Sequence, residues 1–419
     1  MQTLFIDIKG LVGAYKNSPS FLAGAQMKGF KVEKNAWLLI EDDKILDFGN
    51  MSEVPDISGD ANVLSLEGRY VLPSFCDSHT HLVYAKDRDG EFLDRLRGLS
   101  YEEIAAKGGG ILNSANALRE MSEDDLFKEA FERLSDVISL GVGAIEIKSG
   151  YGLSKDGELK MLKVIDRLKK MSQIPIKATF LGCHAVPKEF ENATEYTSYV
   201  IDQMLPEFDS LGLVDYVDAF LEKGYFSVED TERLMVAAEN LGIKSKIHVN
   251  QFTILGGIKS CVNKNAISVD HLEVISDADV VALKESMNND VPTFPVALPI
   301  CSHFLGIPYT DSRRLIDEGL PVVIATDFNP GTAPSGDMLH AIRLGSLKMG
   351  MEPLEAICAG TINGAAAMEL NSEVGTITPG KRANFIITSK INGLETIPYR
   401  LYANIVDKVY VNGSHWVKE

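Results

Sequence analysis

The sequence has few cysteines, an excess of acidic over basic residues and no long hydrophobic run. Its five cysteines are odd in number, widely spread and never arranged as C-x-x-C, which argues against a disulfide framework or a structural zinc knuckle. Lysine and arginine total 41 against 59 acidic residues, and the net charge of −18 repels phosphate backbones and anionic membranes. No stretch approaches about 18 uninterrupted apolar residues, and the N-terminus lacks the pattern of a signal peptide. We therefore expect a cytoplasmic protein with reduced thiols that binds neither nucleic acid nor membrane.

The two ends of the chain share a strand-rich pattern. The length of 419 residues and the 45% hydrophobic content allow one large barrel-type domain with a smaller companion. Short β-type runs punctuated by Asp, Gly and Pro occupy residues 36–48, 62–71, 375–388 and 407–416. The pair Asn412-Gly413 predicts a tight turn in the last run. We predict a small β-sandwich domain built from both chain termini, residues 1–68 and 370–419, with residues 69–369 inserted between them.

The inserted segment alternates apolar, β-branched runs with helical patterns, which is typical of a parallel sheet. Eight candidate strands lie at residues 70–76, 143–148, 176–182, 216–221, 244–249, 266–270, 291–296 and 321–326. Amphipathic helices are predicted between them, for example at residues 124–140, 156–171 and 227–241. The strands span roughly 255 residues, close to the ~250 of a (β/α)8 barrel. We therefore predict an α/β fold with a (β/α)8 TIM-type barrel.

Polar residues follow several of the predicted strands. In such a barrel the active site forms at the C-terminal ends of the strands. The residues at these positions are Asp77, His79 and His81 after the first strand, His184 after the third, His248 after the fifth, His271 after the sixth and Asp327 after the eighth. Five of the eight histidines in the chain therefore fall at strand ends, which predicts a shared site there.

The H-x-H pair of His79 and His81 predicts a metal site. Its two-residue period sends both side chains to one face of an extended segment, so that two imidazoles can share one ion. His248 and Asp327 would complete a set of three nitrogens and one oxygen, which suits zinc or iron and leaves room for a water. Such a metal lowers the pKa of its water and supplies hydroxide as a nucleophile. Any one of these residues alone could equally be a core histidine or a capping aspartate.

Together with the late His, His, Asp series, the run L-P-S-F-C-D-S-H-T-H at 72–81 resembles the metal-dependent amidohydrolases. Further motifs resemble the imidazolonepropionase group within that family, whose members open 4-imidazolone-5-propanoate to N-formimino-L-glutamate. They are G-G-G-I at 108–111, S-G-Y-G-L at 149–153, H-A-V-P at 184–187, D-H-L-E at 270–273 and A-T-D-F-N-P-G-T at 325–332. The resemblance covers nearly the whole chain and implies a homodimer with one divalent or trivalent metal ion per chain, zinc or iron.

The resemblance also implies roles for individual residues. The metal ligands would be His79, His81, His248 and Asp327. The small-molecule substrate would contact Arg88, Tyr101, Tyr151, His184, Gln251, Asn329, Gly331 and Thr332. Chemistry agrees for Arg88, because a planar guanidinium can hold a propanoate carboxylate through two hydrogen bonds. Read without the resemblance, Arg88 is a solvated loop charge and the tyrosines are packing residues.

The expected reaction is attack of metal-bound hydroxide on the ring carbonyl. His184 could donate a hydrogen bond to a substrate oxygen, and Asn329 with the backbone of Gly331 could hold the ring or the product. His271 and Asp327 are the candidates to take the proton of the water and pass it to the departing ring nitrogen. His184, His271 and Asp327 are therefore the predicted catalytic residues, although Asp327 could be purely a ligand and His271 purely structural.

Three other functions stay open at this point. A deaminase of an aminated ring would use an acid three residues after the ligand His248, where this chain has the amide Gln251. A cyclic amidase of the dihydroorotase type would bridge two metals with a carboxylated lysine after the fourth strand, where Glu222 and Lys223 stand. A catalytically silent scaffold protein would have lost ligands, whereas this chain keeps all four.

Overall fold

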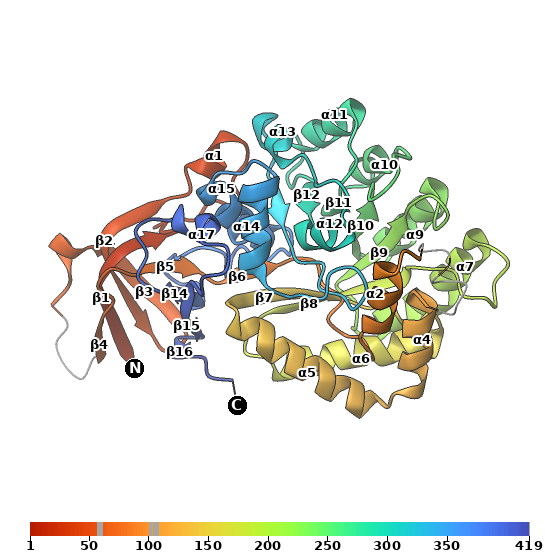
Figure 1. The fold of residues 1–419 in the computed structure, drawn as a ribbon, viewed down its shortest axis with the longest axis horizontal. Helices are drawn as coiled ribbons and strands as arrows, with labels where there is room; N and C mark the ends of the chain where they lie inside the picture. The colour runs from red at the N-terminus through yellow and green to blue at the C-terminus, as the bar shows by residue number, and fades with distance from the viewer. Residues whose placement is uncertain (57–61, 100–102, 104–108, 419) are drawn as a thin grey trace.

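The computed structural model describes residues 1–56, 62–99, 103 and 109–418, which form a barrel sheet and a terminal sheet (Figure 1). The barrel sheet has eight parallel strands in the order β13-β12-β11-β10-β9-β8-β7-β6. Their bounds are β6 Phe75–Asp77, β7 Val142–Lys148, β8 Ile176–Cys183, β9 Tyr216–Leu221, β10 Lys244–Val249, β11 Ser268–His271, β12 Phe294–Ala297 and β13 Val323–Ile324. Neighbouring strands are consecutive in the chain and are joined through the helices between them, and the prediction of a (β/α)8 barrel is confirmed.

The barrel closes where its two edge strands meet. The backbone N–H of Asp327, just after β13, donates to the carbonyl oxygen of His79, just after β6, at 3.0 Å. Just before this contact in both segments, the carboxylate of Asp77 accepts from the backbone N–H and the hydroxyl of Thr326 at 3.0 and 2.6 Å. These bonds place the H-x-H segment beside Asp327 at the C-terminal end of the barrel.

The helices follow the predicted pattern closely. Helices α5 Glu123–Ser139, α6 Lys155–Met171 and α9 Val228–Asn240 lie within one residue of the predicted bounds at each end. Serines at 122, 154 and 227 begin them, because each side chain accepts a backbone N–H of the first turn. The other helices of the barrel domain are α2 Asp89–Leu96, α4 Ile111–Glu120, α7 Ala193–Tyr199, a π-helix Val200–Met204, α8 Leu205–Ser210, α10 Gly257–Asn263, α11 Asp277–Ser286, α12 Pro299–Leu305, α13 Ser312–Asp317, α14 Met338–Lys348, α15 Pro353–Ala359 and α16 Ile362–Ala366.

The terminal sheet joins the two ends of the chain, drawn red and dark blue in Figure 1. Its order is β16-β15-β14-β5-β1-β2-β3, with β4 on β1. The bounds are β1 Gln2–Val12, β2 Val32–Glu41, β3 Lys44–Asn50, β4 Asn62–Ser65, β5 Tyr70–Pro73, β14 Phe385–Thr388, β15 Val406–Val411 and β16 Ser414–His415, with short helices α1 Ala25–Lys28 and α17 Thr396–Tyr399. Asn412 and Gly413 have φ of 47° and 74° and make the predicted turn.

One predicted strand is divided between the two sheets. Residues 70–76 were expected to form a single barrel strand, but β5 pairs with β1 and β14, and only from Phe75 onward does the chain pair with β7. The division places Val71 in the core of the terminal sheet and Phe75 in the core of the barrel. The predicted domain limits at 68/69 and 369/370 stay a prediction.

Most of the core belongs to the barrel. One large cluster of buried apolar residues fills the space between its strands and helices, and a smaller cluster lies within the terminal sheet. All five cysteines are buried free thiols, as their number and spacing predict. The helices in the described part of the chain are too short or too polar to span a bilayer.

Candidate active site

The H-x-H segment leaves β6 in an extended conformation, so its side chains alternate. The hydroxyl of Thr80 donates to the carbonyl oxygen of Glu146 in β7 at 2.6 Å, which anchors the side of the segment turned toward that strand. His79 and His81 project to the other side, where they meet His248 at the end of β10. The period of two that the sequence shows therefore brings two imidazoles together.

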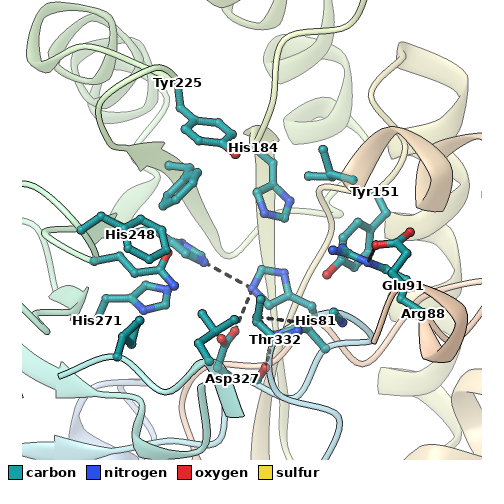
Figure 2. Close-up of a pocket in the computed structure, with 18 of the residues that line it drawn as sticks. His81, Arg88, Glu91, Tyr151, His184, Tyr225, His248, His271, Asp327 and Thr332 are labelled. Carbon is teal, nitrogen blue, oxygen red and sulfur yellow. Dashed lines mark hydrogen bonds and ion pairs between the residues drawn. The ribbon is translucent and has the colours of Figure 1, made fainter. Parts of the chain in front are cut away.

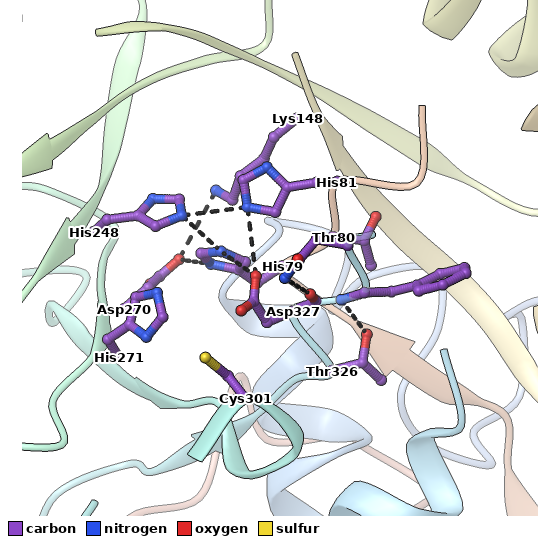
Figure 3. Close-up of polar contacts among 12 residues, drawn as sticks. His79, Thr80, His81, Lys148, His248, Asp270, His271, Cys301, Thr326 and Asp327 are labelled. Atoms are coloured by element: carbon purple, nitrogen blue, oxygen red, sulfur yellow. Dashed lines mark hydrogen bonds and ion pairs between the residues drawn. The ribbon is translucent and has the colours of Figure 1, made fainter. Parts of the chain in front are cut away.

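Three imidazole nitrogens converge at this point (Figure 3). Nε2 of His248 lies 3.1 Å from Nε2 of His79 and 3.3 Å from Nε2 of His81. Nδ1 of His79 contacts the carboxylate of Asp270 at 2.6 Å, and Nδ1 of His248 contacts that of Asp218 at 2.7 Å. Because each of these Nδ1 atoms donates its hydrogen to a carboxylate, both Nε2 atoms present a lone pair to the common point.

This arrangement fits a metal ion. Two unprotonated nitrogens held 3.1 Å apart repel one another unless a cation lies between them. Oδ1 of Asp327 adds an oxygen donor, 3.4 Å from Nε2 of His81 and 3.7 Å from Nε2 of His79. Three nitrogens and one carboxylate oxygen suit zinc or iron in a catalytic site. The geometry thus brings together the four predicted ligands.

A buried group of alternating charges lies behind the histidines, and we call it the charged layer. Its members are Glu146, Lys148, Asp218, Lys246 and Asp270, all fully buried. Nζ of Lys148 contacts Glu146 at 2.6 Å, Asp218 at 2.9 Å and Asp270 at 3.9 Å, and Nζ of Lys246 contacts Glu146 at 2.8 Å. Burial alone would lower the pKa of Lys148, but Asp218, Glu146 and Asp270 raise it above its usual value. The charged layer therefore holds the two carboxylates that orient His79 and His248.

A cavity of about 440 Å³ opens over the three histidines (Figure 2). It is lined by eleven of the predicted site residues, namely His81, Arg88, Tyr151, His184, His248, Gln251, His271, Asp327, Asn329, Gly331 and Thr332. His79 is fully buried beside them. Tyr101 lies outside the described residues, as does Gly108 of the glycine motif. The size and the mixed lining suit a small ligand with polar groups.

His184 is held in one tautomer by a backbone contact. Its Nδ1 lies 3.0 Å from the carbonyl oxygen of Gly150, so this nitrogen carries the hydrogen. Burial lowers the pKa of His184 to about 4, which keeps the ring neutral. Nε2 is then a hydrogen-bond acceptor, whereas a donor to a substrate oxygen was expected. The ring stacks on that of His81 with centroids 5.4 Å apart, so His184 lies directly beside a predicted ligand.

His271 and Asp327 form the titratable part of the cavity wall. Nδ1 of His271 contacts Oε1 of Glu273 at 3.2 Å. Burial alone would lower the pKa of His271, but Glu273 and Asp327 raise it above its usual value. Burial raises the pKa of Asp327 to about 6. Both residues have positive φ, 93° and 57°, a strained conformation that is common at functional sites. The pair can therefore offer an acid and a base near neutral pH.

The loop after β13 is braced from within. Oδ1 of Asn329 accepts the backbone N–H groups of Gly331 and Thr332, both at 2.8 Å. Its Nδ2 donates to the carbonyl oxygen of Asp327 at 2.6 Å. Asn329 thus fixes the backbone that bears Asp327, and the N–H of Gly331, expected to hold substrate, already has a partner.

Arg88 lies across the cavity from His271 (Figure 2). Its Nε donates to Oε2 of Glu91 at 3.0 Å, and Nδ2 of Asn113 donates to the other oxygen of Glu91 at 3.1 Å. The guanidinium rests on Gly331, where an added Cβ would lie 2.5 Å from Cζ of Arg88. The group is therefore oriented on one edge by Glu91 and on one face by a glycine.

Several contributors to the site were not predicted from the sequence. Glu91, Phe92, Arg95, Phe220, Tyr225 and Phe252 line the cavity without belonging to a recognised motif. The charged layer has a signal in the sequence, because Glu146, Lys148 and Asp218 interrupt strands that are otherwise apolar. A buried charge in such a strand needs a partner or a function.

Comparison with known proteins agrees with this geometry. Residues 70–415 match the amidohydrolase family. The chain is 50% identical to the imidazolonepropionase of Christiangramia forsetii and 51% identical to that of Flavobacterium johnsoniae, in each case over 99% of this chain and 100% of the relative. The imidazolonepropionase of Alkaliphilus oremlandii is 38% identical over 93% of this chain and 92% of its own.

Solved structures share the fold at low sequence identity. An atrazine chlorohydrolase from Arthrobacter aurescens TC1, complexed with zinc, superposes with a TM-score of 0.71 at 14% identity, covering 99% of this chain and 95% of its own. A guanine deaminase from C. acetobutylicum superposes with a TM-score of 0.68 at 17% identity, covering 99% and 100%. At such identities the likeness concerns the fold alone.

Proposed function

The chain belongs to the imidazolonepropionases of the amidohydrolase family, and from this premise we propose that it hydrolyses the ring amide C–N bond of 4-imidazolone-5-propanoate to N-formimino-L-glutamate, a step of histidine degradation. The supporting observation is that one cavity of about 440 Å³ combines a metal-ligand set with an oriented guanidinium. A small molecule with a ring carbonyl at one end and a carboxylate at the other matches both.

The metal would be held by His79, His81, His248 and Asp327, as one divalent or trivalent ion per chain, zinc or iron. A cation bound there supplies a Lewis acid for the ring carbonyl and lowers the pKa of a bound water toward neutrality. Asp270 and Asp218 keep the ligating Nε2 atoms of His79 and His248 unprotonated through their contacts with Nδ1.

The protein side chains would divide the proton transfers. Asp327, whose pKa burial raises to about 6, would accept a proton from the attacking water. His271, kept protonated by Glu273, would donate a proton to the ring nitrogen as the C–N bond breaks. His184, neutral with Nε2 free to accept, would receive a ring N–H of the substrate. Tyr151, Gln251, Asn329 and Thr332 would complete the substrate pocket together with Tyr101.

The propanoate carboxylate would bind Arg88. Substitution Gly331→Ala is expected to raise KM about tenfold or more with little change in kcat, because the added Cβ displaces the guanidinium. The displaced atoms are the end of a flexible side chain, so the melting temperature should change little. Arg88→Ala is expected to raise KM at least as much and to leave the metal content unchanged.

Gly90→Ala is the matched control, because an added Cβ there meets nothing within 4 Å and the residue lies two positions from Arg88. Its KM should equal that of the wild type. A normal KM in both Gly331→Ala and Arg88→Ala would remove Arg88 from the substrate pocket.

Product analysis tests the proposed function. Freshly generated 4-imidazolone-5-propanoate should gain one water and give N-formimino-glutamate, while an imidazolone without the propanoate should react far more slowly. Release of ammonia would contradict the proposal and favour a deaminase. Equal rates on the two compounds would contradict recognition of the propanoate.

Two structural features count against the rival functions. Gln251 occupies the position where a deaminase needs an acid, and its Nε2 donates to the sulfur of Cys301 at 3.4 Å. Lys223 is exposed and is not among the residues lining the cavity, which disfavours a lysine that bridges two metals. Glu222 instead accepts the backbone N–H groups of Phe252 and Thr253.

We also propose a homodimer located in the cytoplasm. The dimer follows from the family resemblance. The location is supported by the five free thiols, which suit a reducing compartment.

A further inference from the structure

A second group of metal-ligating side chains lies beside the three-histidine site. His271 at the end of β11, Glu273 two residues later and Cys301 in α12 are all buried, and one donor atom from each lies within 4.8 Å of the other two. Figure 3 shows the sulfur of Cys301 turned toward the space between His271 and Asp327. The group shares none of its members with the predicted ligand set.

The existing contacts leave part of this group without a partner. Oε1 of Glu273 receives hydrogen bonds from Nδ1 of His271 and from the hydroxyl of Ser302, each at 3.2 Å. Oε2 of Glu273 is buried and has no hydrogen-bond partner among the residues that the structure describes. A buried carboxylate oxygen left unpaired is costly, so its position points to a ligand that the side chains do not themselves provide.

The three donors fit a soft divalent cation. Zinc binds imidazole nitrogen at about 2.0 Å and thiolate sulfur at about 2.3 Å, so tetrahedral ligands stand roughly 3.3 to 3.8 Å apart. The three donor atoms, which lie within 4.8 Å of one another, are close to that spacing. A thiolate and a carboxylate also neutralise the charge of a divalent cation, and sulfur selects zinc or cadmium over magnesium or calcium.

We propose that His271, Glu273 and Cys301 form a second metal site, which binds zinc or cadmium and inhibits the enzyme. The cation replaces both the proton between Nδ1 of His271 and Glu273 and the proton of the Cys301 thiol, and the two protons leave to solvent. With its ring held by the cation, His271 no longer serves the leaving nitrogen as the proposed function requires. Binding stands on the geometry alone, whereas inhibition rests on the proposed function.

Cadmium binding to the metal-loaded protein tests the site without any substrate. The first site offers only nitrogen and oxygen donors, so a thiolate-to-cadmium charge-transfer band reports the second site. Cadmium added to wild-type protein holding about one metal per chain should raise this band and the metal content together. Cys301→Ser should abolish the band, and Glu273→Gln should weaken cadmium binding about tenfold or more. Cys358→Ala, which removes another buried thiol, should behave as wild type.

No band in the wild type, or an equal band in Cys301→Ser, would overturn the site. Inhibition is measured separately as turnover against added zinc, relative to the rate of each variant without excess zinc. The zinc concentration that inhibits wild type and Cys358→Ala should be about tenfold lower than the concentration that inhibits Cys301→Ser. Occupancy of the second site with undiminished turnover would overturn its inhibitory role.

Discussion

Substitution His271→Asn is expected to lower kcat by about 10²- to 10⁴-fold and to leave the metal content near that of the wild type. The ring lies beside the ligands, with centroids 5.3 Å from His248 and 5.9 Å from His79, yet its Nδ1 contacts Glu273. Asparagine retains a polar side chain but cannot donate a proton in this pH range. The prediction therefore separates a proton donor from a metal ligand.

Steady-state kinetics and metal quantification on the same sample check this result. His303→Asn serves as the control, because His303 is exposed on α12 and should show wild-type kcat. If metal is lost together with activity, His271 is a ligand. A kcat within about threefold of the wild type would remove it from the reaction.

Substitution Lys148→Met is expected to lower the free energy of unfolding by about 3–5 kcal/mol. The charged layer contains three carboxylates and two lysines, and Lys148 contacts all three carboxylates, at 2.6, 2.9 and 3.9 Å. Without it, Asp218 and Asp270 stay buried with only Lys246 of the layer to offset three negative charges. Burial already raises the pKa of Asp270 to about 6, so this carboxylate would take up a proton more readily.

Urea unfolding measures this effect, with Lys170→Met as the matched control. Lys170 pairs with Asp166 on the exposed face of α6, with 72% of its side chain exposed, so its loss should change stability by less than about 1 kcal/mol. Equal stability of the two variants would show that Lys148 does not hold the charged layer together.

The sequence could predict the parts of the site that depend on strand ends. H-x-H spacing and the positions of His248, His271 and Asp327 after apolar runs follow from the barrel topology, in which all C-terminal strand ends share one rim. The family motifs added Arg88 and the loop at Asn329. What spacing could not show is how a side chain is turned. The tautomer of His184 depends on the carbonyl oxygen of Gly150, 34 residues earlier.

Features that depend on tertiary packing were missed for the same reason. Residues 70–76 read as one apolar strand, and only the pairing partners β14 and β7 reveal that Tyr70–Pro73 and Phe75–Asp77 belong to different sheets. The motif D-H-L-E contains Asp270, but the sequence assigned this residue no role. Its contact with Nδ1 of His79 joins residues 191 positions apart, which spacing cannot show. Periodicity reports which face a residue occupies and leaves its partner undetermined.

The most direct test of the account is turnover of 4-imidazolone-5-propanoate in samples whose metal content is set between zero and one per chain. Loss of the ultraviolet absorbance of the substrate and formation of N-formimino-glutamate would be followed after chelation and after stepwise restoration of zinc or iron. We predict that turnover is lost on chelation and returns in proportion to metal, up to about one ion per chain. Full turnover in metal-free protein, or none with one metal bound, would contradict the account.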